Sequence, residues 1–426
     1  MGLVIAMRGR LLSNRLAAAV GAGLVAVVLF GGIGLLTRST GQTTEVASPT
    51  TSLSSATVTS RPASEDVAST TTDPTTTTTA LGPLLLEWSR VTRDQVFVDA
   101  HPWAVAANDE RIVAVGSVGF TADPEAWTSS DGISWTRSTD PDDVFGYDQD
   151  VFDITATDSG FVIVGARYPV GAAVWLSPDG TSWARAPNVE QPDDTASIST
   201  VTTGGPGLVA IGAASGEVVV WTSTDGFAWS IVSSDEANFG VGFVMAVAES
   251  RQGLVAVGYD EASGDSIVWT STDGIAWSRI RHDESLFGDS VMWDVAAFES
   301  GFVAVGGERT PGGEAVVWHS LDGADWARVR DEDAVFGSSS MRSVTATNVG
   351  LVAVGGERGD DENWDIIWTS RDGLTWVRLP DMTGAPTDAT RGDSVLFAIT
   401  TGGPGVIAVG RDAYSNDAVV WTATLE

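Results

Sequence analysis

The sequence of 426 residues predicts an all-β fold, a seven-bladed β-propeller of four-stranded blades closed by its own N-terminal strand. One observation is a buried-strand signature that occurs seven times: RIVAVG at 111–116, GFVIVG at 160–165, GLVAIG at 207–212, GLVAVG at 253–258, GFVAVG at 301–306, GLVAVG at 350–355 and GVIAVG at 405–410. A second is the tryptophan that ends the next apolar run in each unit: Trp127, Trp175, Trp221, Trp269, Trp318, Trp368 and Trp421. A period near 48 residues with four short strands per unit is typical of a propeller blade.

Six of the units continue into a tight turn of the form Ser-x-Asp-Gly-x-x-Trp. The aspartate can accept hydrogen bonds from the backbone of its own turn, and the following glycine tolerates positive φ. The last tryptophan is expected to open the outer strand. The six structural aspartates are Asp131, Asp179, Asp225, Asp273, Asp322 and Asp372.

The seventh unit ends at WTATLE and lacks an outer strand of its own. The segment EWSRV at 87–91 is similar to WARV at 326–329, an outer strand of the repeat. We therefore expect this N-terminal strand to complete the last blade, which would leave no sheet edge open.

The turns resemble the Asp-box (BNR-like) repeat of sialidase-superfamily propellers, Ser-x-Asp-x-Gly-x-Thr-Trp. Here the motif is one residue shorter, and its threonine occurs only at Thr375. The resemblance spans residues 127–376. It implies a propeller whose turns cap the blade edges away from the active face, and it implies no particular activity.

The chain before the propeller is predicted to anchor it in a membrane. Residues 16–36 contain no charge and lie between Arg15 and Arg38, so as a helix of 21 residues they are long enough to cross a bilayer as a signal-anchor. More arginine before than after this segment places residues 1–15 in the cytoplasm and the propeller, residues 84–426, outside the cell membrane. Residues 37–83, rich in Ser and Thr, are predicted to form a disordered linker.

Composition excludes several classes of function. A formal net charge of −33 argues against nucleic acid as a partner. The absence of cysteine excludes disulfides and thiolate chemistry. No cofactor is predicted, because the three histidines share no ligand-like spacing. A divalent cation at acidic clusters is the alternative: Asp140, Asp142 and Asp143, or Asp360, Asp361 and Glu362.

One position of the innermost strand, eight residues before each signature strand, carries mostly apolar side chains: Trp103, Phe152, Ser199, Met245, Trp293, Arg342 and Phe397. It is two residues from an apolar position, such as Val344 in the sixth unit. Strict alternation along a strand would put both on one sheet face, in a ring that packs the blades together. Arg342 does not fit such a ring and is expected to need a carboxylate, with Asp153 and Asp294 as candidates, or a ligand.

The loops between the second and third strands open on the face where propellers usually bind their ligands. They supply the other candidate ligand-binding residues, which with Arg342 are Glu308, Arg309, Glu357, Arg358 and Trp364. Trp364 has no role in the repeat and is flanked by acids, so it is expected either to contact a ligand or to pack under its own loop.

The connections between blades carry a recurrent acid-x-x-Phe pattern. Its phenylalanines are predicted to be structural plugs between blades, with the acid three residues earlier capping the turn: Phe97, Phe145, Phe239, Phe287 and Phe336.

Together these features predict a binding or scaffold module for a protein or a cell-envelope glycan. The first alternative is a sialidase-like glycoside hydrolase, for which Arg309, Arg342 and Arg358 would have to converge on one carboxylate. The second is an assembly factor for a membrane complex. No catalytic residue is assigned, because the four tyrosines show no pairing with a glutamate in sequence.

Overall fold

The structure is a computed structural model. It describes residues 84, 86–91, 95–119, 123–138, 144–146, 148–232, 237–239, 242–299, 301–310, 312–331, 334–358, 363–379, 394–403, 405–412, 415 and 417–425. The predicted cytoplasmic segment, membrane helix and linker, together covering residues 1–83, lie outside these ranges. Among the described residues, no helix combines the length and the apolar character needed to cross a bilayer.

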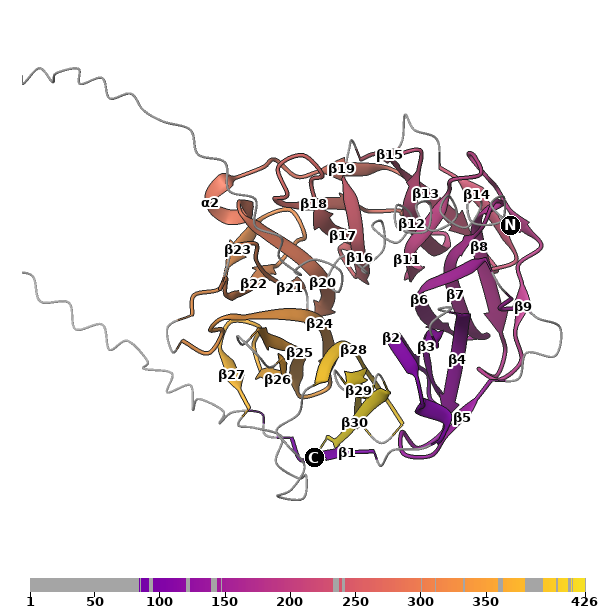
Figure 1. The fold of residues 1–426 in the computed structure, drawn as a ribbon. Coiled ribbons are helices and arrows are strands. Elements are labelled where there is room, and N and C mark those ends of the chain that lie inside the picture. Colours follow the sequence, from indigo (N-terminus) through magenta and orange to yellow (C-terminus); the bar gives the residue numbers. More distant parts are fainter. Residues whose placement is uncertain are drawn as a thin grey trace, which may run out of the picture. The chain divides into compact units, whose positions relative to one another are not determined.

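Seven antiparallel sheets surround a common centre, which confirms the prediction of an all-β, seven-bladed propeller (Figure 1). The innermost strands of successive blades contact one another around the whole ring, including those of blades 7 and 1. From blade 1 to blade 7 these innermost strands are β2 (Ala100–Ala107), β6 (Gln149–Thr157), β11 (Ser197–Gly204), β16 (Phe243–Ser250), β20 (Ser290–Phe298), β24 (Ser339–Thr347) and β28 (Ser394–Gly402).

The other strands follow outward in each blade. The second strands, which carry the repeated signature, are β3 (Ile112–Val118), β7 (Gly160–Arg167), β12 (Gly207–Ala214), β17 (Gly253–Tyr259), β21 (Gly301–Glu308), β25 (Gly350–Arg358) and β29 (Gly405–Asp412). The third strands are β4 (Asp123–Ser129), β8 (Gly171–Ser177), β13 (Glu217–Ser223), β18 (Ser266–Ser271), β22 (Ala315–Ser320), β26 (Asn363–Ser370) and β30 (Ala418–Thr424). The outer strands of blades 1 to 6 are β5 (Trp135–Arg137), β9 (Ala184–Arg185), β14 (Ala228–Ile231), β19 (Trp277–Arg279), β23 (Trp326–Arg328) and β27 (Trp376–Arg378).

The outer strand of blade 7 comes from the other end of the propeller sequence. β1 (Trp88–Arg90) lies antiparallel to β30, with Trp88 opposite Ala423. Two connections between blades add a short parallel strand each, β10 (Asn188–Val189) beside β14 and β15 (Ala237–Asn238) beside β19. Two others form a single helical turn, η2 (Gln95–Phe97) and α2 (Glu284–Phe287).

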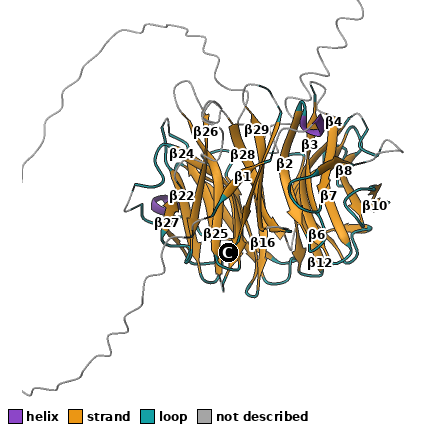
Figure 2. Cartoon of the chain, turned by 90° about the horizontal axis from the view of Figure 1, so that it is seen from below, coloured by secondary structure: helices purple, strands orange, loops and turns teal. Residues whose placement is uncertain are grey.

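The strands run between two faces of the propeller, where its loops gather (Figure 2). The loop face is where the innermost strands begin, and it carries the loops between second and third strands and the connections between blades. The turn face is the opposite one, and it carries the six Ser-x-Asp-Gly-x-x-Trp turns. The turns therefore lie away from the loop-face residues that the sequence suggests as ligand contacts.

The signature strands are apolar without alternation because both faces of each sheet pack against a neighbouring blade. In blade 4, Val255 faces blade 5 and Leu254 and Ala256 face blade 3, and all three are buried. The tryptophans of the third strands lie among these residues. In blades 1 to 6, each donates a hydrogen bond from Nε1 to a carbonyl of a connection between blades; for Trp318 the acceptor is the carbonyl of Leu286, at 2.8 Å.

The turn aspartates act as the sequence suggests. Oδ1 of Asp273 accepts hydrogen bonds from the backbone N–H groups of Ile275 and Ala276, at 2.9 and 2.8 Å, and these donors hold its pKa below the ordinary value. The following residue, Gly274, has φ of +75°. The same bonds recur at the other five turns: Asp131, Asp179, Asp225, Asp322 and Asp372.

The connecting phenylalanines are buried plugs, as predicted: Phe97, Phe145, Phe239, Phe287 and Phe336. The residue that caps the turn is not the expected one in the two connections where a cap is described. Before Phe287 the cap is Asp283 rather than Glu284, and before Phe336 the acceptor is Asp331.

Each innermost strand contains a β-bulge that the sequence did not reveal. The pairing register between first and second strands skips one residue in every blade: Trp103, Phe152, Ser199, Met245, Trp293, Arg342 and Phe397. An extra residue resets the alternation, so each of these residues and the apolar position two residues later lie on opposite sides of the strand. The prediction that the seven share one sheet face with these apolar positions is therefore wrong, and of the seven only Trp103 packs against a cluster of buried core residues in the described part of the chain, the one between blades 1 and 2.

Candidate ligand-binding site

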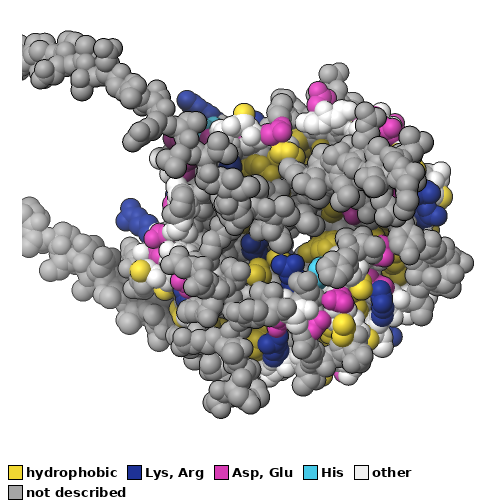
Figure 3. Space-filling view, in the orientation of Figure 1, with side chains coloured by type: hydrophobic (Ala, Val, Ile, Leu, Met, Phe, Trp, Pro, Cys, Tyr) yellow, Lys and Arg dark blue, Asp and Glu magenta, His cyan; other side chains and the backbone are white. Residues whose placement is uncertain are grey.

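The seven bulge residues form an axial ring around the centre of the propeller. All seven are partly exposed, whereas six of the seven apolar residues two positions later are buried, Val105 being the exception. Figure 3 shows a hollow at this centre, with hydrophobic and basic side chains around it. The bulges come early in the innermost strands, so the axial ring lies toward the loop face. Four of its members are aromatic: Trp103, Phe152, Trp293 and Phe397.

The axial ring is ordered by contacts from one blade to the next. Trp103 of blade 1 donates from Nε1 to the carbonyl of Val151 in blade 2, at 3.0 Å. Arg342 of blade 6 holds its guanidinium carbon 5.7 Å from the centre of the Phe397 ring in blade 7, a cation–π contact. Arg342 is partly exposed, so its charge keeps contact with solvent.

Two aspartates next to the bulges tie neighbouring innermost strands together. Oδ2 of Asp294 accepts from Ser343 Oγ at 2.8 Å and from the N–H of Val344 at 2.9 Å, both in blade 6. Asp153 does the same with Thr200 and Val201 of blade 3, at 2.9 Å each. Sequence reasoning had offered both aspartates as partners for Arg342, whereas these contacts give them a structural role.

Both carboxyls lie in surroundings that disfavour their charge. Desolvation by the surrounding blades is the main cause, and it raises the pKa of Asp294 to about 6 and that of Asp153 above its ordinary value. The hydrogen bonds from the next blade act in the opposite direction and do not cancel the effect.

The glutamates predicted as ligand contacts are held within their own blades. Glu308 accepts from Arg328 at 2.5 Å, and Glu357 accepts from Arg378 at 2.7 Å. Each pair joins the end of a second strand to the outer strand of the same blade. Asp260–Arg279 in blade 4 and Asp412–Arg90 in blade 7 repeat the arrangement. The recurrence indicates a structural link rather than a site specific to blades 5 and 6.

Arg309 is exposed and lies against the neighbouring blade. A Cβ built on Gly264, in the loop of blade 4, would lie 1.2 Å from Nη1 of Arg309. The guanidinium of Arg309 therefore occupies space that only a glycine at position 264 leaves open. Arg309 thus reaches toward blade 4 while Arg342 reaches toward blade 7. These two arginines do not converge as a sialidase-like carboxylate site would require.

The remaining predicted contacts are described only by their backbone. Arg358 ends β25 and is paired with Asn363, and Trp364 on β26 is paired with Glu357. Their side chains, and the acidic clusters at 140–143 and 360–362, lie outside the described residues. Trp364 remains a predicted ligand contact.

The structure also shows a buried carboxyl at the junction of blades 6 and 7. Asp365 on β26 accepts a hydrogen bond from the hydroxyl of Ser394, the first residue of β28. Its Oδ1 is buried without a hydrogen-bond partner among the described residues. Desolvation is the main cause that raises the pKa of Asp365 to about 7, and the charge of Asp412 adds to it.

Replacing Asp365 by asparagine is expected to alter how stability depends on pH. A folded-state pKa above the unfolded value means that the contribution of Asp365 is complete below about pH 4 and is lost as pH rises to about 7. Because the residue is partly exposed, solvent screening reduces the effect, and the expected loss in the free energy of unfolding is about 2 kcal/mol. Urea unfolding at pH 5 and pH 8 should show a smaller decrease for Asp365→Asn than for the wild type. Equal decreases would contradict this role of the carboxyl.

Comparison with known proteins agrees with the fold. Residues 172–424, more than half of the chain, match the family described as the DUF6242 beta propeller domain. No curated protein sequence matches this chain.

Two solved structures illustrate how distant the similar folds are. An ulvan lyase of polysaccharide lyase family PL25, bound to -[GlcA(1-4)Rha3S]-, is 11% identical over 79% of this chain and 96% of its own, with a TM-score of 0.49. The endosialidase of phage phi92 is 9% identical over 80% of this chain and 69% of its own, with a TM-score of 0.44. At these values neither likeness indicates what this chain binds.

Proposed function

We propose that this chain, which belongs to the DUF6242 β-propeller domain family, is a binding module that takes a neutral glycan of the cell envelope at its axial ring. The observation that carries the proposal is the β-bulge repeated in all seven blades. It leaves four aromatic side chains partly exposed on the innermost strands, which surround the centre of the propeller. Partly exposed aromatic residues gathered in a concave place are typical of a ligand site.

The chemistry of the axial ring favours a glycan. Flat aromatic side chains offer apolar faces to sugar rings, while Arg342 and Ser199 supply polar groups that can bind hydroxyls. A polyanionic chain is disfavoured because the protein carries a formal net charge of −33. A protein partner remains the second candidate, with Trp364, which is not one of the seven bulge residues, as its predicted contact. In both cases residues 16–36 would anchor the module in the cell membrane, with the propeller outside.

Binding of the full-length protein to a panel of neutral oligosaccharides (chito-, manno- and gluco-oligomers) tests the proposal. The double variant Trp293→Ala/Phe397→Ala should weaken binding at least tenfold, because loss of a buried aromatic contact typically costs 1 kcal/mol or more. Phe227→Ala is the matched control, since Phe227 is an aromatic residue 57% exposed on the turn face. Circular dichroism would establish that all three proteins are folded.

Two outcomes would count against a glycan at the axial ring. One is equal affinity of the wild type and the double variant for an oligosaccharide that binds. The other is no binding to the panel, combined with capture of an envelope protein that Trp364→Ala abolishes. The second outcome would favour the scaffold function on the loop face instead.

A further inference from the structure

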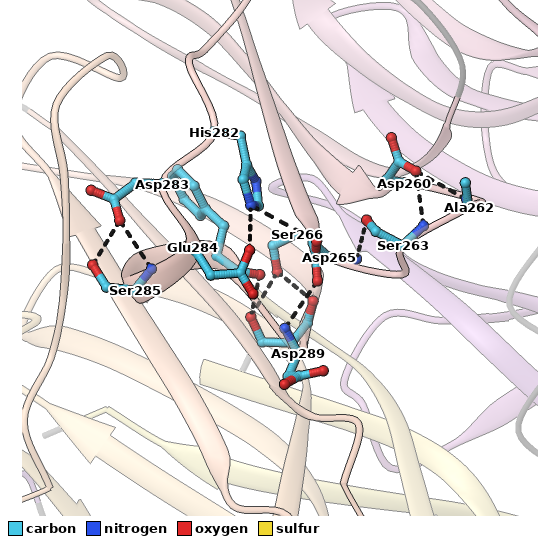
Figure 4. Close-up of polar contacts among 12 residues, drawn as sticks. Asp260, Ala262, Ser263, Asp265, Ser266, His282, Asp283, Glu284, Ser285 and Asp289 are labelled. Atoms are coloured by element: carbon cyan, nitrogen blue, oxygen red, sulfur yellow. Dashed lines mark hydrogen bonds and ion pairs between the residues drawn. The ribbon is translucent and has the colours of Figure 1, made fainter. Parts of the chain in front are cut away.

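Three side chains from two segments converge on the loop face between blades 4 and 5. Asp265 precedes β18, His282 lies in the connection to blade 5, and Glu284 begins α2 (Figure 4). One ligand atom of each lies within 4.8 Å of the others. The histidine spacing in the sequence predicted no metal site, because two of the three ligands are not histidines and the fold brings them together.

The distances between donor atoms suit one metal ion. His282 Nε2 is 3.2 Å from Glu284 Oε2 and 3.8 Å from Asp265 Oδ2. Metal–ligand bonds of about 2.0–2.2 Å place neighbouring donor atoms of a tetrahedral site about 3.3–3.6 Å apart. An ion can therefore sit among the three with small side-chain movements, and its remaining position stays open to water.

Contacts outside the cluster hold two of the donors in place. Oδ1 of Asp265 accepts from the N–H of Asp289 at 3.0 Å, which leaves Oδ2 directed toward His282. The ring of His282 lies 6.3 Å from that of Phe287, the buried plug of this connection. Asp283, which lies between His282 and Glu284 in the chain, caps α2 by accepting from the N–H of Ser285. Supporting contacts of this kind are typical of metal sites.

The Asp265–Asp289 hydrogen bond has an equivalent in another blade, whereas His282 has no equivalent histidine in the other connections. Asp417 accepts from the N–H of Asp99 at 3.0 Å, so the bond of Asp265 to Asp289 recurs in blade 7 and belongs to the fold. Five residues before the plug phenylalanine, however, only this connection has a histidine. The five residues at that position are Thr92, Asp140, Ser234, His282 and Asp331. An imidazole is thus not needed to close a blade connection.

We propose that Asp265, His282 and Glu284 bind a divalent first-row transition metal of the Zn²⁺ type, independently of the glycan site. An imidazole ligand disfavours Mg²⁺ and Ca²⁺, which prefer all-oxygen sites, and two carboxylates balance the charge of a dication. The ion would tie the start of β18 in blade 4 to the connection that leads into blade 5.

Titration of the EDTA-treated full-length protein with ZnCl₂ tests the site. Calorimetry should show one Zn²⁺ ion bound with a dissociation constant in the micromolar range, and saturating Zn²⁺ should raise the melting temperature. His282→Ala should weaken binding at least tenfold and abolish the thermal shift, whereas His319→Ala, which changes a histidine elsewhere in blade 5, should leave both unchanged. Titration with Co²⁺ should give visible absorption bands that His282→Ala removes.

The proposal fails if the wild type binds no Zn²⁺ below millimolar concentration. It also fails if His282→Ala and His319→Ala bind equally well, since the ion would then sit elsewhere on an acidic surface. If His282→Ala does not fold, Glu284→Gln carries the test, because the side chain of Glu284 is 79% exposed and its loss should not disturb the fold. No glycan is involved, so the result is independent of the axial ring.

Discussion

Alanine in place of Gly258 is expected to destabilise the propeller by about 3 kcal/mol or more, since backbone atoms leave no room for a methyl group. A Cβ at this position would be 1.8 Å from the carbonyl oxygen of Phe243 on β16. Gly258 is paired with Val244, the residue before the register shift at Met245. The bulge brings the innermost strand over the second strand here, and only a glycine allows that approach.

The innermost strand approaches the equivalent glycine equally closely in every blade, so replacing that glycine by alanine should destabilise the propeller to a similar extent in any blade. The glycine that ends each signature would place a Cβ 1.8–2.1 Å from a carbonyl oxygen of the innermost strand: Gly116, Gly165, Gly212, Gly258, Gly306, Gly355 and Gly410. If β16 moved away to relieve the overlap, the bulge would be lost and Met245 would leave the axial ring. The repeated signature therefore preserves the geometry of the candidate site as well as the fold.

Urea unfolding of Gly258→Ala against Gly216→Ala measures this effect. No atom lies within 4 Å of a Cβ on Gly216, whose φ of +84° should cost about 1–2 kcal/mol on its own. A Gly258→Ala protein as stable as this control would show that the two strands can separate freely. The close approach would then not be what selects glycine at the end of the signature.

The bulges explain why sequence reasoning reached the fold and misplaced the candidate site. The spacing of the tryptophans and the six turns are local sequence patterns, and they predicted the number of blades and their order along the chain. A bulge inserts one residue without changing the apolar composition, so counting back from the signature assigned Trp293 and Arg342 to the wrong side of the strand. The glycine at the end of each signature was the available signal, because a recurrent glycine inside a strand marks a close approach of another backbone.

The ionic contacts were predictable to different degrees. The third residue of the outer strand is arginine in blades 4 to 7, and the acids at the ends of the second strands recur as well, so Glu308–Arg328 could have been inferred from the repeat. Asp265, His282 and Glu284 could not, because their approach depends on how one particular connection folds over the start of β18. Spacing along the chain contains no information about that arrangement.

Truncating Trp318 to alanine is expected to cost about 3–5 kcal/mol of unfolding free energy, the range for removing a large aromatic side chain from a core. The indole is fully buried between blades 4 and 5, where it shares a cluster with Phe287 and Met292. It also fixes the connection between the two blades through its hydrogen bond to the carbonyl of Leu286. Its loss would therefore create a cavity and release the connection. Urea unfolding would detect the loss of stability, and faster protease cleavage in residues 280–289 would detect the released connection.

Phenylalanine at the same position separates the two contributions. Trp318→Phe keeps most of the buried area but leaves the carbonyl of Leu286 without its donor, which should cost about 1–3 kcal/mol beyond the packing loss. Phe302→Leu provides the comparison for packing alone, because Phe302 is buried in the same cluster and has no hydrogen-bonding group in its side chain. Phe302→Leu should thus cost less than Trp318→Phe by that amount. Equal costs would mean that packing alone holds the connections, and that the hydrogen bonds which the third-strand tryptophans of blades 1 to 6 share add nothing to it.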